Sequence, residues 1–192
     1  MEEYIGLWNR YKTASTADFA LDEETGAVRL RDGDNVTVGG LIADKTIKYT
    51  KNDKVMAFLQ VEDMVGTVEV IVFPKDYEKY SSYLTEDRKV FVKGRVSLEE
   101  DRDGKIILEK LTAFDEIPRK LWIKFAGMED YNAQEAHMLD IIRDSEGIDS
   151  VVVYLEKERA GKVLPHNHNV KADSALLEKL SAAFGADNVK VV

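Results

Sequence analysis

The stretch that decides the fold covers residues 35–80 and reads NVTVGGLIADKTIKYTKNDKVMAFLQVEDMVGTVEVIVFPKDYEKY. Apolar and polar residues alternate along it with the period of β-strands, and turn residues divide it at regular intervals. The pattern predicts three strands, at residues 36–50, 55–61 and 67–73. The pair Gly39-Gly40 predicts a bulge or a sharp bend within the first of them.

The residues that follow continue the pattern of a small barrel. Pro74 ends the third strand, and Tyr77, Tyr80 and Leu84 have the spacing of a short helix. Two more strands are predicted at 89–98 and 105–114, joined by an acidic hairpin whose Asp103-Gly104 is typical of a type I′ turn. Three strands, a helix and two strands are the order of an OB-fold, a five-stranded Greek-key barrel that binds oligonucleotides on the face of strands 2 and 3. We therefore predict an OB-fold nucleic-acid-binding domain over residues 35–116.

Two further segments flank this domain. In residues 1–34, an apolar stripe at helical spacing predicts an N-terminal helix followed by a polar connector; the stripe consists of Tyr4, Leu7, Trp8 and Tyr11. After Pro118, residues 117–192 predict a second domain with the order βαββαβ. Its first helix has an N-cap signal at Asn132, its third strand is expected at 162–170, and its second helix is expected to begin after Asp173 and to end at Gly185. This order is typical of the ferredoxin-like, or split-βαβ, arrangement.

The composition excludes several classes of protein. The chain has 192 residues and no cysteine, which excludes a disulfide framework, a thiol nucleophile and a Cys-ligated metal site and fits a reducing cytoplasm. No apolar run approaches the ~20 residues that span a bilayer, and the opening Met1-Glu2-Glu3 has the wrong charge for a signal peptide. We expect a soluble, cytoplasmic protein. The 27 basic and 36 acidic residues give a net charge of −9, which argues against coating nucleic acid through bulk charge.

Alternation on the second and third strands predicts which side chains leave the barrel. Phe58 and Gln60 on one strand, and Glu69, Ile71 and Phe73 on the other, are expected on the outer face, because the Val, Leu and Ala residues between them fill the interior. An outward aromatic ring on an OB sheet is a platform on which a base can stack. The alternative is that Phe58 or Phe73 packs under the N-terminal helix or a neighbouring domain.

Local charge supports the same face. Four lysines and Tyr49 surround the first loop against Asp53 alone, and the fourth strand is basic without an acidic residue between Arg88 and Arg95. A solvated surface would also be rich in lysine, but the combination with Phe58 is typical of a single-strand track and predicts weak, salt-sensitive binding. The predicted nucleic-acid site consists of Lys45, Lys48, Tyr49, Lys51, Lys54, Phe58, Gln60, Glu69, Phe73, Lys93 and Arg95.

Signals of catalysis are weak. His166 and His168 could form a metal pair on one strand face, but a polar strand edge or loop explains them better, because no third ligand lies nearby in sequence. The acidic hairpin at 99–103 is better explained as a solvated tip than as a cation site. The sequence has no phosphate-binding loop, dinucleotide fingerprint or nucleophile elbow. We predict no catalytic residue, no metal site and no cofactor.

Five segments carry a family resemblance: VGGLI, the TK turn, MAFLQVED, GTVEVIVFP and YEKY, all between residues 38 and 80. Together they resemble the OB domain near the C-terminus of bacterial DNA polymerase III alpha subunits of the DnaE type. The opening EEYIGLW is similar to the segment that enters this domain, and the βαββαβ tail has the position and length of the C-terminal domain. The resemblance implies a fragment of a DNA-directed DNA polymerase that lacks the upstream palm domain with the catalytic aspartates.

The resemblance also implies partners. In this family the OB domain is associated with single-stranded template DNA, and the C-terminal domain docks the clamp-loader tau subunit in some bacteria. The MAFLQVED strand is also similar to the OB domain that reads anticodons in class II aminoacyl-tRNA synthetases, where an aromatic residue at the position of Phe58 stacks on a base. The leading hypothesis is therefore a module that binds single-stranded DNA, and the alternatives are a protein-docking fragment and an anticodon-type module that binds RNA.

Overall fold

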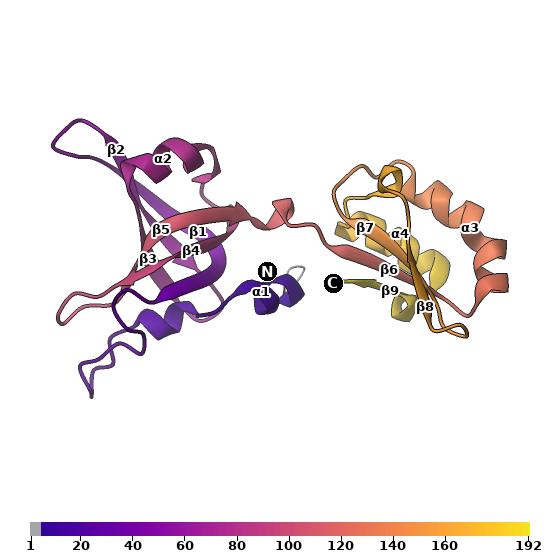
Figure 1. Cartoon of the computed structure of the whole chain (residues 1–192), viewed down its shortest axis with the longest axis horizontal. Coiled ribbons are helices and arrows are strands. Elements are labelled where there is room, and N and C mark those ends of the chain that lie inside the picture. The colour runs from indigo at the N-terminus through magenta and orange to yellow at the C-terminus, as the bar shows by residue number, and fades with distance from the viewer. Residues whose placement is uncertain (1–4) are drawn as a thin grey trace. The chain divides into compact units, whose positions relative to one another are not determined.

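The computed structural model describes residues 5–192, which form two compact units (Figure 1). The first unit ends at Asp115 and the second covers Glu116–Val192. Each unit has its own hydrophobic core. Within the described residues, no helix has the length and apolar character needed to cross a membrane.

The first unit is built around a closed five-stranded barrel with the strand order β1-β2-β3-β5-β4. Only β3 and β5 pair in parallel, and the other neighbours are antiparallel. A short helix, α2, lies between β3 and β4 in sequence, and apolar side chains from all five strands fill the interior. This confirms the predicted OB-fold. The elements are β1 (Asn35–Tyr49), β2 (Val55–Glu62), β3 (Thr67–Val72), α2 (Pro74–Tyr80), β4 (Lys89–Ser97) and β5 (Lys105–Ala113).

The bulge predicted at the two glycines of β1 is not there. Gly39 and Gly40 pair regularly with β4, and the irregularity in β1 lies between Ile42 and Asp44 instead. A Cβ atom at Gly39 would lie 2.5 Å from Cδ1 of Trp8, and one at Gly40 would lie 2.4 Å from the carbonyl oxygen of Glu62. The glycines are therefore needed because other parts of the chain approach the strand closely.

Helix α1 (Ile5–Tyr11) packs against the barrel through Trp8. The indole N–H of Trp8 donates a hydrogen bond to the carbonyl oxygen of Gly39 at 2.6 Å, and Tyr11 contacts the ring of Phe91. The predicted N-terminal helix is thus present, although its first expected stripe residue, Tyr4, lies outside the described residues.

The connector after α1 is fixed to the barrel by hydrogen bonds. Asp63, in the turn between β2 and β3, accepts hydrogen bonds from the backbone N–H of Thr16 at 3.0 Å and from its hydroxyl at 2.6 Å. Within the connector, the Ser15 N–H donates to the Asp18 carboxylate at 2.8 Å, which lowers the pKa of Asp18. The connector therefore belongs to the barrel unit rather than forming a free linker.

The second unit has the predicted βαββαβ order but not a split-βαβ sheet. Its strands follow the order β8-β7-β6-β9, and β6 and β7 are direct parallel neighbours. In a split βαβ unit another strand would separate them. The elements are β6 (Lys120–Phe125), α3 (Met128–Ile142), β7 (Ser150–Leu155), β8 (Ala160–Val163), α4 (Ser174–Phe184) and β9 (Val189–Val191).

The burial of β7 and β8 explains this strand order. Three consecutive valines of β7, residues 151–153, are buried, as is typical of a strand in the middle of a sheet. All four residues of β8 are exposed, and their sequence AGKV supplies little apolar surface. The short β8 therefore lies at the edge of the sheet, and β7 takes the place beside β6.

Two boundaries of this unit differ from the sequence prediction, and the ends of helix α4 agree with it. Helix α3 begins at Met128 instead of after Asn132, and Asp130 in its first turn accepts a hydrogen bond from the Ala126 N–H. The third strand ends at Val163, because the chain then turns at Pro165. Helix α4 begins and ends as predicted: Asp173 accepts a hydrogen bond from the Leu176 N–H, and Gly185 follows the helix with φ 92°.

Candidate nucleic-acid interface

A row of outward side chains crosses the barrel from β1 to β4. Phe58 on β2 is paired with Thr46 on β1 and with Ile71 on β3. Ile71 is paired with Ile107 on β5, which is paired with Arg95 on β4. Phe58, Ile71 and Ile107 are only partly buried, whereas their sequence neighbours lie in the core. We call Thr46, Phe58, Ile71, Ile107 and Arg95 the central row; it forms an apolar stripe with a cation at its β4 end.

The ring of Phe58 lies next to a cation of the neighbouring strand. The ammonium group of Lys48 is 4.6 Å from the ring centroid, within the range of a cation–π interaction. Helix α1 packs elsewhere, around Gly39 on β1, so it is not the element that covers Phe58. The aromatic face and a positive charge thus lie together on the outer surface of the barrel.

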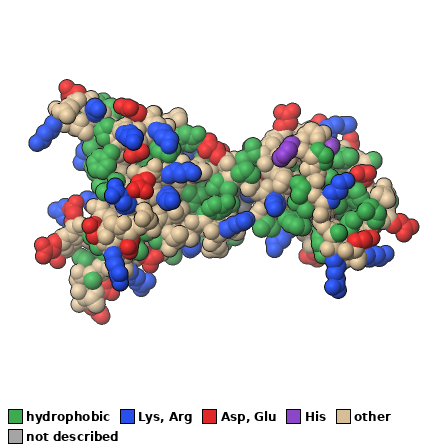
Figure 2. Space-filling view, viewed as in Figure 1, with side chains coloured by type: hydrophobic (Ala, Val, Ile, Leu, Met, Phe, Trp, Pro, Cys, Tyr) green, Lys and Arg blue, Asp and Glu red, His purple; other side chains and the backbone are tan. Residues whose placement is uncertain are grey.

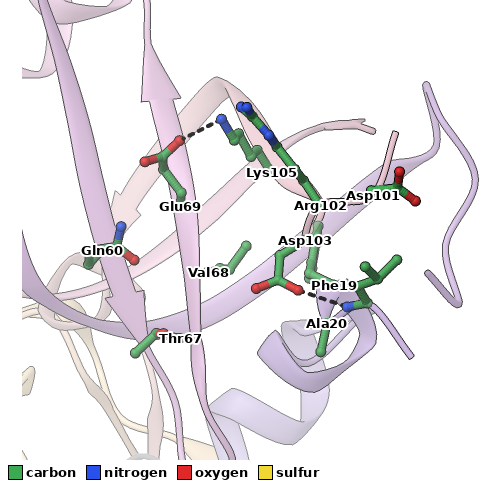
Figure 3. Close-up of a pocket in the computed structure, with 12 residues that line it drawn as sticks. Phe19, Ala20, Gln60, Thr67, Val68, Glu69, Asp101, Arg102, Asp103 and Lys105 are labelled. Carbon is green, nitrogen blue, oxygen red and sulfur yellow. Dashed lines mark hydrogen bonds and ion pairs between the residues drawn. The ribbon is translucent and has the colours of Figure 1, made fainter. Parts of the chain in front are cut away.

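A second, polar row runs beside the central row. Gln60 is paired with Glu69, and Glu69 with Lys105. The Lys105 Nζ atom is 3.2 Å from a Glu69 carboxylate oxygen, as Figure 3 shows, and 3.6 Å from one of Glu99. These side chains form one wall of a cleft of about 510 Å³. The connector at Phe19–Leu21 and the hairpin between β4 and β5 form the other walls.

The remaining basic residues lie on the two sides of the central row. Lys51 and Lys54 are exposed at the tip of the hairpin between β1 and β2, where Asp53 takes the left-handed conformation with φ 55°. Lys93 on β4 is exposed and paired with Lys110 of β5, while Arg95 forms an ion pair with Glu109 at 2.8 Å. Figure 2 shows Lys and Arg side chains spread over the visible face of the barrel unit.

The structure does not bring all predicted residues to this face. Lys45 is paired with Leu59, on the side of β1 opposite to Phe58, and its Nζ atom donates a hydrogen bond to the Leu84 carbonyl oxygen at 2.6 Å. Tyr49 is 71% exposed but is paired with Val55, on the other side of the hairpin from Lys48. The structure therefore gives Lys45 a structural contact and separates Tyr49 from the central row.

Four residues that the sequence analysis did not include in the site also lie on this face. Ile71, Ile107, Lys105 and Lys110 lie in or beside the two rows. Phe73 is 43% exposed and lies just beyond β3, where it precedes α2. Alternation along β5 would have indicated Ile107 and Lys105, provided that the pairing of β3 with β5 was also considered.

The histidines do not share a strand face. His166 and His168 lie in a single turn of 3-10 helix after β8. Residues 5–192 contain no cluster of three or more His, Asp or Glu side chains arranged to hold a metal ion.

Comparison with known proteins finds similarity over the barrel. Residues 36–113 match the tRNA anticodon family, which is described as an OB-fold nucleic acid binding domain. Among solved structures, the chain is similar to asparaginyl-tRNA synthetase from Pyrococcus horikoshii, with 24% identity over 45% of this chain and 21% of that chain and a TM-score of 0.34. The family match covers most of the barrel and agrees with its OB-fold.

Two curated relatives are DNA polymerase III alpha subunits. The one from Bacillus subtilis is 29% identical over 150 residues, 76% of this chain. The one from Borreliella burgdorferi is 26% identical over 191 residues, 94% of this chain, a length that must include residues of both units. The chain spans only 13% and 17% of these two relatives. The resemblance to DNA polymerase III alpha subunits is thereby confirmed.

Proposed function

We propose that the barrel binds single-stranded DNA along the central row and that the chain is a non-catalytic part of a bacterial DNA polymerase III alpha subunit. The observation that carries the proposal is the apolar stripe of Phe58, Ile71 and Ile107 between Lys48 and Arg95. The similarity to polymerase III alpha subunits supports DNA as the ligand.

The geometry supports a path for the strand across the sheet. Three inter-strand steps of about 4.8 Å separate Phe58 from Arg95, so the row is about 14 Å wide and suits a few nucleotides. A base can stack on Phe58 while Lys48 moves from the ring to a phosphate. Lys51 and Lys54 would meet phosphates on one side, and Lys93 and Arg95 on the other. Such a surface holds and guides a strand without reacting with it.

Phe58→Ala is expected to weaken the binding of fluorescein-labelled oligo-dT, measured by anisotropy, by about 5- to 150-fold. This range corresponds to the ~1–3 kcal/mol that one stacked base contributes. Phe58→Leu keeps apolar volume without an aromatic face and should show most of the loss. Tyr49→Ala, an equally aromatic and more exposed site on the other side of the hairpin, should change affinity less than twofold. The proposal fails if Phe58→Ala combined with Lys51→Ala leaves binding unchanged.

The affinity is also expected to fall steeply with salt. If Lys48, Lys51, Lys54, Lys93 and Arg95 each neutralise one phosphate, the plot of log K against log salt has a slope of about −3.5, from 5 × ~0.7 for single strands. Between about 50 and 200 mM salt this is a loss of about 100-fold. Lys51→Ala should reduce the slope by about 0.7, whereas Lys179→Ala, in the second unit, should leave it unchanged. A slope near zero would contradict binding through these side chains.

RNA is the second candidate ligand of the barrel, because the matched family is named for the tRNA anticodon. Titration with oligo-U of the same length as the oligo-dT distinguishes the two. An affinity for oligo-U, or for one tRNA, at least tenfold tighter than for oligo-dT would favour the anticodon-type function.

The C-terminal unit is in turn a candidate docking module for the clamp-loader tau subunit. The similarity to polymerase III alpha subunits extends into this unit, and its helix α3 carries four acidic residues and no Lys or Arg, a charge that suits a basic partner. A pull-down of tau by the full chain should succeed, and reversal of Glu129 and Asp140 to lysine should weaken it. Failure of the unmodified chain to retain tau would reject this role.

A further inference from the structure

The C-terminal sheet has a second face that the unit's core does not use. Leu121 and Ile123 on β6, and Val151 and Val153 on β7, pack into the core with residues of α3 and α4. Because side chains alternate along a strand, the residues between them point to the other side of the sheet. This side, which we call the open face, carries Lys120, Trp122, Lys124, Val152, Tyr154, Gly161 and Lys190.

Two aromatic rings occupy the middle of the open face. Trp122 is on β6 and Tyr154 on β7, the two central strands, and both side chains are partly exposed. Their ring centroids are 6.3 Å apart and the ring planes meet at 62°. Val152 is only 2% exposed, and a Cβ at Gly161 would lie 3.4 Å from Cζ3 of Trp122, so the indole lies across Val152 toward β8.

Lysines surround these rings. Trp122 is paired directly with Lys190 on β9, and Lys120 and Lys124 precede and follow it on the same face of β6. Lys124 lies 3.4 Å from Glu156, whereas Lys120 and Lys190 are exposed and make no ion pair within residues 5–192. Four acidic residues of the unit lie on α3, in the other layer. In a unit with 10 basic and 13 acidic residues, the open face is therefore locally basic, with three lysines against Glu156.

We infer that the open face is a second binding surface for single-stranded nucleic acid, separate from the barrel. Aromatic rings on the central strands of a four-stranded sheet, with helices behind it, can stack successive bases, and the lysines around them match the charge of the phosphates. An acidic peptide could also meet the lysines, but the pair of aromatic rings favours nucleic acid, whose bases stack on such rings. The inference does not depend on binding by the barrel.

The test uses the full chain labelled with ¹⁵N and an unlabelled oligo-dT of eight nucleotides at low salt. The chain has two tryptophans, Trp8 and Trp122, so it gives two indole N–H signals, which Trp122→Phe assigns. We expect the Trp122 signal to shift on titration, and to shift with the same dissociation constant when the barrel carries Phe58→Ala and Lys51→Ala. Lys120→Glu with Lys190→Glu should weaken this response about tenfold or more. The matched control, Lys171→Glu with Lys179→Glu, changes the net charge equally at exposed positions away from the open face and should alter it less than twofold.

Three outcomes of the titration would reject the inference. The Trp122 signal could stay unchanged up to about 1 mM oligonucleotide, could lose its response in the barrel variant, or could respond equally to the two pairs of charge reversals. A shift with an oligo-glutamate peptide but not with oligo-dT would assign the face to a protein partner instead. If Trp122 responds while Phe58→Ala leaves total binding unchanged, the inference stands and the proposed role of the barrel fails.

Discussion

Replacement of Asp149 by alanine is expected to destabilise the C-terminal unit by about 3–5 kcal/mol, the usual cost of leaving one partner of a buried ion pair without the other. Asp149 is 3% exposed. Its carboxylate accepts hydrogen bonds from the Arg119 backbone N–H at 2.8 Å, the Ala172 N–H at 3.0 Å and the Arg119 guanidinium at 3.0 Å. The pair joins the start of β6 to the segment before α4, so its loss affects the whole unit.

Urea unfolding, followed separately by signals of the two units, measures this effect. The barrel transition should stay within about 0.5 kcal/mol of the unmodified chain, because the units have separate cores. Asp140→Ala is the matched control: it removes an ion pair with Arg143 whose side chains are 62% and 70% exposed, and such surface pairs contribute about 0–1 kcal/mol. Equal losses in the two variants would contradict a structural role for the buried pair.

Gly94→Ala is expected to destabilise the barrel by about 3 kcal/mol or more, the upper end of the usual cost of overpacking. A Cβ atom at this position would lie 2.1 Å from the carbonyl oxygen of Ile107 and 2.7 Å from a methyl group of Ile106. The first of these is backbone of the paired strand β5 and cannot rotate away. To make room, β4 must separate from β5 where Arg95 and Ile107 end the central row.

This variant should therefore lose oligo-dT binding together with stability, in contrast to Phe58→Ala, which should lose binding alone. Gly6→Ala provides the control, since nothing lies within 4 Å of the position of its Cβ and alanine favours a helix. It should be neutral or stabilising by up to about 1 kcal/mol. A Gly94→Ala chain with an unchanged urea midpoint would show that the strands adjust easily.

Local pattern was sufficient to predict the barrel, because alternation, turn residues and the order of elements all point to the same fold. It was not sufficient for Gly39 and Gly40, because their neighbours, Trp8 and the Glu62 carbonyl, are distant in sequence. The C-terminal strand order was wrong for a different reason. The sequence contains a contrast between the three valines of β7 and the AGKV of β8. The prediction of the strand order did not use this contrast and relied on the order of elements alone.

For the candidate site too, local pattern predicted some residues correctly and others not. Alternation placed Phe58, Gln60 and Glu69 on the outer face, where the structure also has them. Lys45 and Tyr49 were grouped with Lys48 by closeness in sequence, although the period of two along β1 puts them on the opposite side. The contribution of Ile107 depends on the parallel pairing of β3 with β5, a long-range contact that no local pattern contains.

The connection between the two units is short, since only residues 117–119 separate the 3-10 turn after β5 from the start of β6. A strand held by one unit would therefore stay at a millimolar effective concentration for the other, wherever the geometry lets it reach both. Two surfaces with modest individual affinities would then act as one bivalent binder, whose overall affinity depends on the length of the nucleic acid strand. Oligonucleotides too short to bridge the units would miss this gain, however well they fit either surface.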